Sequence, residues 1–345
     1  MIPWFAVQGL VLPPAATPLL TALAKLGVNG EAARLGRYCM DEGITWGGAL
    51  IRAEQLLNGV ERNFITRDEA ARLVQEQPAI LRCELRPVYE DAHLLVVEKP
   101  WGVQLRLPAE AQSSPNEPSV HDWLVASHPA VVTPSGTTRV CHNLDLATSG
   151  VLACAKSEAA AREVSRCFAD RSAKKLYAAL VFGHPEWDTR NVSARIQVTS
   201  RKFRQSVTKA ASGKEARTTA VVAARGKLLL PPHKGRDATL LWLTPHTGRR
   251  HQLRLHMAHI GFPIVGDFTY AADRLPYRMF LHAAALELPV RGLGLDGTSV
   301  VAAAPLSPQG WGDAFQPSEP VRSPAEWPDA ARSLAGVDLE HCGGS

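Results

Sequence analysis

Short apolar runs bounded by turn residues recur between Pro87 and Pro289, and they limit this part of the chain to a fold built around a β-sheet. The run Leu94–Val97 shows the pattern, because it consists of branched apolar residues and is closed by the turn sequence KPWG. Similar runs predict further strands at 151–155, 175–184, 216–223, 239–243 and 283–289.

Helical spacing interrupts these strands in only a few places. The segment SEAAAREVSRCFAD places its apolar residues on one face behind Ser157, a favourable N-cap residue. A second helix is expected for SVHDWLVASHP, within a long polar connection over 104–137, and a third from about 249 to 260, ended by Gly261. Many strands with few helices indicate an α+β domain with a mixed, largely antiparallel sheet.

The chain divides into three parts. Residues 1–86 predict a helical N-terminal extension, in which Thr66 and Glu69 form a capping-box pattern. Residues 87–307 carry the strand pattern of a single domain. Residues 308–345 are rich in Pro, Ser and Gly and poor in large apolar side chains, so a mostly disordered tail is expected there.

Composition excludes several classes of protein. No run approaches the roughly 18 to 20 apolar residues of a membrane helix, so no membrane span is expected. The six cysteines are scattered without a CxxC pair, which favours reduced thiols in the cytoplasm over a secreted disulfide scaffold. Because Arg34 and Arg37 follow the first acidic residue, Glu31, a mitochondrial or other organellar presequence is the alternative. Nothing indicates an obligate assembly, so a monomer is expected.

Basic residues gather in one segment, although the formal net charge of the whole chain is only +5. Seven arginines and lysines lie between Arg195 and Arg217, against a single acid, Glu215. A stripe of this kind attracts phosphates. The alternative is a solvated, twisted hairpin that turns its basic side chains outward.

Two short segments carry candidate chemistry. In HNLDLATSG, hydroxyl residues and a glycine follow Asp145, and the tight turn they permit could hold a carboxylate at a cleft wall. An aspartate that only bonds its own turn is the alternative. In HTGRRHQLRLHMAHIG, arginines and histidines crowd together without an acid, which favours an anion-facing surface or one buried arginine paired with a distant carboxylate.

Metal and nucleotide cofactors find no support in the motifs. His251, His256 and His259 lie close together, but no HExxH pattern, nearby acidic ligand or cysteine pair accompanies them, so no metal is expected. The sequence has no Walker-type loop and no GxSxG nucleophile elbow.

Five stretches, in order, resemble the motifs of the RluA-type family of RNA pseudouridine synthases. YEDAHLLVVEKPWGV resembles the opening strand and KPxG turn, and HNLDLATSGVLACAK resembles the HRLDxxTSGxLLxAK motif. KKLYAALVFGH resembles the KxYxAxVxG strand, TGRRHQLRLHMAHIGFPIVGD the GRxHQxRxH segment, and LHAAALELP the closing HAxxLxF strand. The resemblance covers residues 87–307 and implies a catalytic domain of the pseudouridine synthase type.

This resemblance implies isomerisation of uridines in structured RNA, either ribosomal or transfer RNA, without a metal or organic cofactor. Asp145 matches the essential aspartate, which acts on a flipped uridine as nucleophile at C1′ or as base at C2′. Arg254 matches a basic residue that pairs with this carboxylate and keeps it ionised. Tyr177 matches a tyrosine that stacks on the target base and whose hydroxyl can serve in proton transfer. Leu286 matches an apolar position that lines the pocket.

Other residues at matching positions, together with the basic segment, are expected to hold the RNA. The predicted substrate-binding residues are Asn143, Leu286, Arg249, His251, Lys99, Arg204 and Lys209. Asn143 departs from the family pattern, which has an arginine two residues before the aspartate. The substitution removes a charge that can contact phosphate but leaves the other motif residues intact, so activity with altered substrate handling is expected. The alternative is a catalytically impaired RNA-binding protein of the same fold.

Overall fold

The structure is a computed structural model, and it describes the strand-rich part of the chain. The described residues are 85–101, 103, 105, 119–199, 204–229, 233–267, 269–271, 273, 279–290, 299–304, 306, 311–312, 314–324 and 327, with 25, 60 and 66–68. The predicted helical extension over residues 1–86 lies almost entirely outside them.

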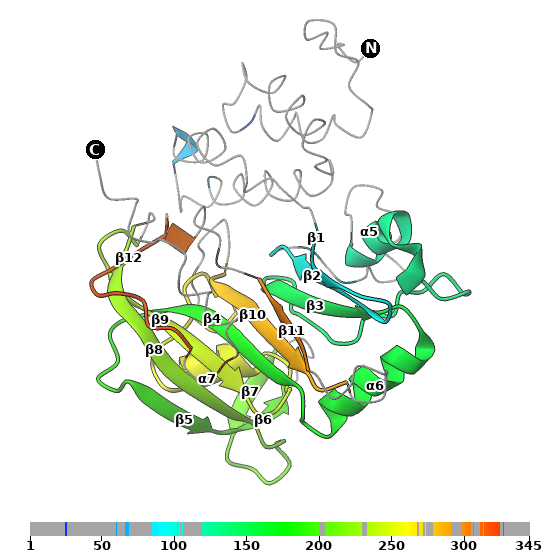
Figure 1. The fold of residues 1–345 in the computed structure, drawn as a ribbon. Helices are drawn as coiled ribbons and strands as arrows, with labels where there is room; N and C mark the ends of the chain where they lie inside the picture. Colours follow the sequence, from blue (N-terminus) through cyan, green and yellow to red (C-terminus); the bar gives the residue numbers. More distant parts are fainter. Residues whose placement is uncertain are drawn as a thin grey trace, which may run out of the picture.

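A single large sheet organises the described residues (Figure 1). Its strands are β1 (Arg86–Glu90), β2 (Leu94–Lys99), β3 (Ser149–Ala155), β4 (Lys174–Phe182), β5 (Thr189–Ser193), β8 (Arg217–Leu228), β9 (Asp237–Pro245), β10 (Leu281–Leu288), β11 (Val300–Ala303) and β12 (Phe315–Pro317). The spatial order is β1-β2-β3-β10-β4-β9-β8-β12, with β11 beside β10 and β5 beside β8. Among these strands only β3 and β10 pair in parallel, which confirms a mixed, largely antiparallel sheet.

Each apolar run of the sequence forms one of these strands. The run at Leu94–Val97 lies within β2, where all four residues are buried. Both faces of β3 are buried throughout, which explains why its sequence is continuously apolar rather than alternating. The sequence did not predict β1, β5, β11 and β12, which are short and lie beside longer strands.

The three helices also follow their sequence signals. Helix α5 (Val120–Ser127) begins with a complete capping box between Ser119 and Asp122. Helix α6 (Glu158–Ala169) begins at Ser157, whose hydroxyl accepts from the backbone of Ala160. A short 3₁₀ turn, η4 (Pro129–Val131), follows α5.

The third helix is shorter than predicted. Helix α7 spans Gln252–His259, whereas a helix from about residue 249 was expected. The N-cap residue His251 has φ of 57°, in the left-handed region, so the regular helix cannot extend back through it. The Gln252 side chain closes the turn in front of the helix, because its Oε1 accepts from the Thr247 hydroxyl at 2.6 Å and from the Arg249 backbone at 3.1 Å.

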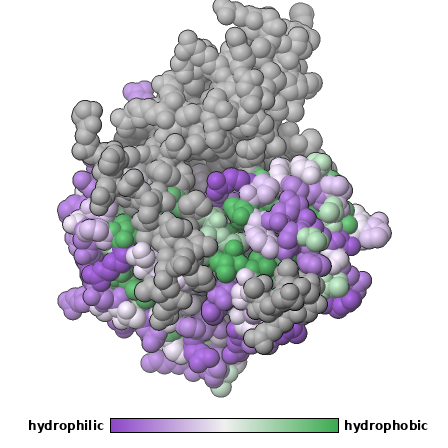
Figure 2. Space-filling model, in the orientation of Figure 1, coloured by the Kyte–Doolittle hydropathy of each residue, from purple (hydrophilic) through white to green (hydrophobic). Residues whose placement is uncertain are grey.

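The basic segment forms a separate two-stranded hairpin. Strands β6 (Arg195–Val198) and β7 (Gln205–Thr208) pair antiparallel, and the side chains of Arg204, Lys209 and Lys214 are exposed. In the orientation of Figure 1, the lower edge of the molecule, where β5, β6 and β7 lie, is mostly hydrophilic (Figure 2). The predicted outward-facing hairpin is therefore confirmed as a structure, and the exposed side chains of Arg204, Lys209 and Lys214 can meet an anionic partner.

The prediction of a disordered tail from residue 308 is wrong for the described part of that segment. Strand β12 pairs with β8, and the Trp242 indole donates to the Arg322 carbonyl at 2.8 Å. Trp311, Phe315 and Trp327 are all buried. A few large aromatic side chains bury enough apolar surface to order a segment whose average composition resembles a disordered one.

The sheet divides its apolar core into two clusters. One cluster joins β2, β3 and β10 to α5 and α6, and the other joins β4, β8 and β9 to α7. Gly150 lies where β3 meets β10, with φ of 114°, and a Cβ atom there would fall 2.1 Å from the Ala283 carbonyl oxygen. Only glycine permits this close approach, which holds the start of β3 against the centre of the sheet. No helix in the described residues is long and apolar enough to cross a membrane.

Candidate active site

The loop that carries Asp145 is tied to β3, the strand that follows it. The backbone of Cys141 donates to the Ala153 carbonyl at 2.9 Å, and the Ala153 amide donates back to the His142 ring at 3.0 Å. A turn follows, in which the Thr148 amide donates to the Asp145 carbonyl at 3.0 Å. The Asp145 carboxylate keeps 22% of its side-chain surface exposed, so it remains open to a substrate.

Lys99 contacts the Asp145 loop from the interior of the protein, and its side chain does not reach the surface. Its side chain is fully buried, and its ammonium donates to the carbonyls of Pro100 at 2.8 Å, Val103 at 2.9 Å and Leu146 at 3.3 Å. The predicted contact between Lys99 and the substrate is therefore wrong for this structure. The buried ammonium instead joins the KPWG turn to the residue that follows Asp145.

Arg254 is the buried arginine of the site, and its main partner is Asp267. The guanidinium forms two hydrogen bonds with Asp267, from Nε to Oδ2 and from Nη2 to Oδ1, both at 2.8 Å. Its Nη1 lies 3.5 Å from Oδ2 of Asp145. The side chains of Arg254 and Asp267 are only 8% and 1% exposed, and burial lowers the pKa of Arg254, but hydrogen bonds and charge from Asp267 outweigh it and raise that pKa.

This geometry meets the expectation of one buried arginine paired with a distant carboxylate, and it adds a second carboxylate. Asp267 also accepts from the backbone amides of Thr269 and Tyr270. Because Asp267 holds Arg254 in a two-bond arrangement, the third guanidinium nitrogen is directed at Asp145.

His251 faces the second carboxylate oxygen of Asp145. Its Nε2 lies 3.7 Å from Oδ1 of Asp145, and its Nδ1 lies 2.7 Å from the Tyr270 hydroxyl. The Gln205 backbone amide donates to that hydroxyl at 3.0 Å, so we assign the hydroxyl proton to the bond with Nδ1. The ring proton then lies on Nε2, the atom that faces Asp145.

The charge states of these groups fit this assignment. Burial lowers the pKa of His251, and the neighbouring Arg254 and Arg250 lower it further, whereas Asp145 acts in the opposite direction. Burial also raises the pKa of Tyr270, as do the charges of Asp267 and Asp145. At neutral pH the imidazole is therefore uncharged and the Tyr270 phenol keeps its proton.

Tyr177 lies on β4, close enough to Asp145 to respond to its charge. Burial raises the pKa of Tyr177, and the Asp145 carboxylate raises it further, so the phenol is neutral. The half-buried ring packs against both core clusters, at the centre of the sheet where β3, β10 and β4 are neighbours. Leu286 on β10 is buried in the core cluster beneath, so its predicted place in the pocket wall stays a prediction.

The predicted RNA-binding residues are less uniformly placed. Asn143, Arg204 and Lys209 are exposed. Arg249 is partly covered, because its Nε donates to the Glu215 carbonyl at 3.0 Å. His251 belongs to the Asp145 cluster described above.

The three histidines considered as metal ligands have separate environments. Both nitrogens of the buried His256 have protein partners, the Thr218 hydroxyl at 2.9 Å and the Ala194 carbonyl at 3.3 Å. His251 faces Asp145, and His259 is exposed. Within the described residues, no three His, Cys, Asp or Glu side chains are grouped to hold a metal ion.

Sequence reasoning missed three residues of the site. Asp267 and Tyr270 do not belong to any pattern that could be interpreted from spacing. The only signal was that no acidic residue lies in the segment around Arg254, which indicated that this arginine pairs with a carboxylate from another part of the chain. Leu146 was also missed. Its side chain is 50% exposed directly after Asp145, which places an apolar group at the mouth of the site.

Acidification is expected to weaken the fold through His142, in the Asp145 loop. Burial and the charge of Lys175 lower the pKa of His142 to about 4. The unfolded chain takes up this proton near the ordinary pKa of about 6.5, so the free energy of unfolding falls as the pH drops from about 6.5 to about 4.

Urea unfolding at pH 7 and pH 5 measures this effect. In His142→Gln the side-chain oxygen can still accept from the Ala153 amide but does not titrate, so the unfolding midpoint should depend less on pH than in the wild type. An equal decrease in both proteins would assign the acid sensitivity to other groups.

Comparisons with known proteins agree with this geometry. Residues 93–259, which include Asp145, Tyr177 and Arg254, match the family described as RNA pseudouridylate synthase. The chain is 38% identical over 210 residues to the dual-specificity RNA pseudouridine synthase RluA of Haemophilus influenzae, covering 59% of this chain and 88% of that protein. It is 35% identical over 225 residues to RNA pseudouridylate synthase domain-containing protein 1 of Danio rerio, and the alignment covers 62% of this chain and 73% of that protein.

A solved structure shares the fold as well. The structure of human RNA pseudouridylate synthase domain containing 1 is 30% identical to this chain and superimposes with a TM-score of 0.56. The alignment covers 68% of this chain and 90% of the human one.

Proposed function

This chain belongs to the RluA-type family of RNA pseudouridine synthases, and from this premise we propose that Asp145 is the catalytic group with which it isomerises uridine in RNA to pseudouridine. The single observation that supports the assignment best is the position of the Asp145 carboxylate. It is partly exposed, 3.5 Å from a buried arginine whose other nitrogens are held by Asp267. Arg254 therefore places a positive charge directly beside the carboxylate that is proposed to act on the ribose.

The carboxylate acts on the ribose of the flipped uridine, as nucleophile at C1′ or as base at C2′. The bond between C1′ and N1 breaks, the uracil turns in the pocket, and C5 forms the new bond to C1′. In the nucleophile route this step breaks the bond between C1′ and the Asp145 carboxylate, and in the base route the carboxylate returns its proton to C2′. The proton on C5 is lost and N1 gains one, so the product is an isomer of the substrate. Tyr177, which keeps its own proton, stacks on the base and can pass a proton in these steps.

We propose a structured ribosomal or transfer RNA as the substrate. Extruding a uridine from such an RNA costs a few kcal/mol, and less in a loop than in a helix. The exposed basic side chains of the β6–β7 hairpin, with Arg249 near the start of α7, supply contacts to the flanking phosphates that repay this cost.

Lys209→Ala is expected to weaken RNA binding for every sequence tested and to reduce the salt dependence of the affinity. Each lost phosphate contact lowers the slope of log affinity against log salt by roughly one unit. Filter binding at several salt concentrations gives that slope. Lys227→Ala is the matched control, since Lys227 is also exposed but lies on β8 and pairs with Asp237. Equal slopes for both variants and the wild type would mean that the hairpin is only a solvated surface.

Pseudouridine mapping of total RNA tests the proposal as a whole. Cells lacking the gene should lose one site or a few sites, which the wild-type gene restores and Asp145→Asn does not. An unchanged map in cells shown to express the protein would favour the alternative, a catalytically impaired RNA-binding protein. Asn143, where relatives carry arginine, would then be the first residue to revert.

A further inference from the structure

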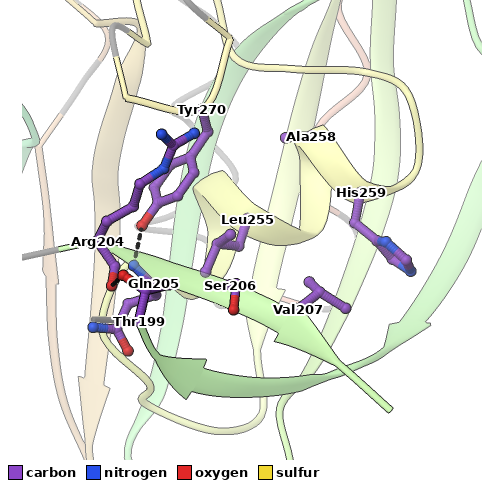
Figure 3. Close-up of a pocket in the computed structure, with 9 residues that line it drawn as sticks. All are labelled: Thr199, Arg204, Gln205, Ser206, Val207, Leu255, Ala258, His259 and Tyr270. Carbon is purple, nitrogen blue, oxygen red and sulfur yellow. Dashed lines mark hydrogen bonds between the residues drawn. The ribbon is translucent and has the colours of Figure 1, made fainter. Parts of the chain in front are cut away.

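A second concave surface lies beside the Asp145 site, between the β6–β7 hairpin and α7 (Figure 3). Its cavity volume is about 380 Å³, and its walls include Arg204, Gln205, Val207, Leu255, His259 and Tyr270. Asp145 is not part of its lining. We refer to this surface as the hairpin groove.

The hairpin groove and the Asp145 site share one residue. The Tyr270 ring forms part of the groove wall, while the Tyr270 hydroxyl bonds to His251, whose other nitrogen faces Asp145. Only one imidazole ring therefore separates the edge of the groove from the proposed catalytic carboxylate. Whatever occupies the groove lies next to a substrate at Asp145.

The chemistry of the lining suits a flat ring that carries a negative charge. Val207 and Leu255 supply apolar surface, and Tyr270 supplies an aromatic ring. The Arg204 guanidinium lies 5.8 Å from the centre of the Tyr270 ring, and Figure 3 shows the two side chains beside each other. None of the described residues that line the groove carries a carboxylate. Aromatic rings stack on bases of any sequence, and arginine binds phosphate, so an unpaired nucleotide satisfies both features.

The Tyr270 wall of the groove packs against a fixed side chain, whereas the Arg204 side chain on its other face can move. On the inner side the Arg254 guanidinium lies 5.1 Å from the centre of the Tyr270 ring, and Arg254 is fixed by Asp267. Arg204 is exposed, so its side chain can move to admit a base and close over it. A rigid aromatic wall facing a movable cation is an arrangement that can select an unstacked base at low entropic cost.

We propose that the hairpin groove binds one unpaired nucleotide of the RNA, a near neighbour of the target uridine, with its base against Tyr270 and its phosphate at Arg204. This inference rests on the proposed function and adds to it a second subsite, through which the enzyme recognises the RNA around its target. The size fits, since a volume of about 300 Å³ or more is typical of sites that enclose a small ligand.

The test uses a filled groove and a set of RNAs that lack single bases. Ala258→Trp places an indole in the groove from α7, and Ala159→Trp is the matched control, because Ala159 is exposed on α6, away from the groove. The substrate is a stem-loop RNA that carries the mapped uridine, together with four copies in which the base at one of the two positions on either side has been removed. The readout is kcat/KM for pseudouridine formation with the full-length protein.

We expect removal of one particular flanking base to lower kcat/KM of the wild type by roughly 5- to 150-fold, the range for losing one stacked base. On the complete RNA, kcat/KM of Ala258→Trp should be lower than that of the wild type by a similar factor. On the RNA that lacks this flanking base, its kcat/KM should not fall any further. Ala159→Trp should behave as the wild type on all five RNAs. If Ala258→Trp fails to fold, Ser206→Trp, which fills the groove from β7, takes its place with the same expected result.

Two results would overturn the inference while leaving the proposed function in place. One is a wild type that tolerates removal of each flanking base. The other is a groove variant that folds and remains as sensitive to the missing base as the wild type. A wild type that forms no pseudouridine in any RNA would instead reject the proposed function itself.

Discussion

Replacing Asp145 with asparagine is expected to abolish pseudouridine formation, with a fall in rate of at least about 10²- to 10⁴-fold, while RNA affinity stays within a few-fold of the wild type. Asparagine has nearly the same shape as aspartate but lacks the charged oxygen that attacks or removes a proton. The substitution should also leave the site intact, because Arg254 keeps its two hydrogen bonds to Asp267. Single-turnover assays and binding to the same RNA measure the two effects separately.

The matched control for this prediction is Asp237→Asn. Asp237 is also an ion-paired aspartate, but it is half-exposed at the start of β9 and bonds to Lys227. Its loss should change neither rate nor affinity measurably. Pseudouridine formation retained by Asp145→Asn would remove this carboxylate from the mechanism, and lost affinity would mean that its charge also organises the RNA-binding surface.

The fold could be predicted where the sequence is continuously apolar and less well where burial depends on distant contacts. Strands β2, β3, β4 and β10 could be predicted from short apolar runs, because most of their residues are buried. Strand β12 could not be recognised in this way. Its order comes from Trp311, Phe315 and Trp327 packing onto residues elsewhere in the chain, and average composition does not report such contacts.

In the site, too, residues within sequence motifs could be predicted, whereas contacts between distant parts of the chain could not. Asp145 and Arg254 were predicted from motifs, and the structure brings them to 3.5 Å. The roles of Asp267 and Tyr270 could not be predicted, because spacing does not say which acid or phenol reaches a buried arginine. Lys99 was placed wrongly for a related reason. A sequence shows that a lysine is charged but not that three carbonyl groups surround its ammonium in the interior.

Asp145 is therefore held mainly by groups that never need to touch the substrate. The loop is tied to β3 through His142 and to the KPWG turn through Lys99, while Asp267 fixes the arginine that faces the carboxylate. This support allows Asp145, the proposed reacting group, to remain partly exposed. In the proposed reaction, a carboxylate held in this way meets its substrate in a fixed geometry, which lowers the cost of reaching the transition state.

The largest loss of stability is expected from Asp267→Asn, which leaves a buried guanidinium with an uncharged partner. Breaking one side of a buried ion pair typically costs about 3 to 5 kcal/mol, because the remaining charge is desolvated without compensation. Both side chains are almost fully buried, so solvent cannot replace the lost interaction. Urea unfolding gives the change in free energy. Glu158→Gln, which breaks the exposed pair with Arg162 on α6, is the matched control and should cost no more than about 0.5 kcal/mol.

A double variant separates stability from chemistry at this pair. Arg254→Met combined with Asp267→Leu replaces the ion pair with apolar side chains of similar volume, and such replacements are often neutral or stabilising. We expect the double variant to regain part of the stability lost in Asp267→Asn, because the Thr269 and Tyr270 amides lack their acceptor. We expect it to be inactive, because nothing then holds a positive charge 3.5 Å from Asp145. Recovered activity in the double variant would show that the pair serves only the fold, and that Asp145 works without its arginine.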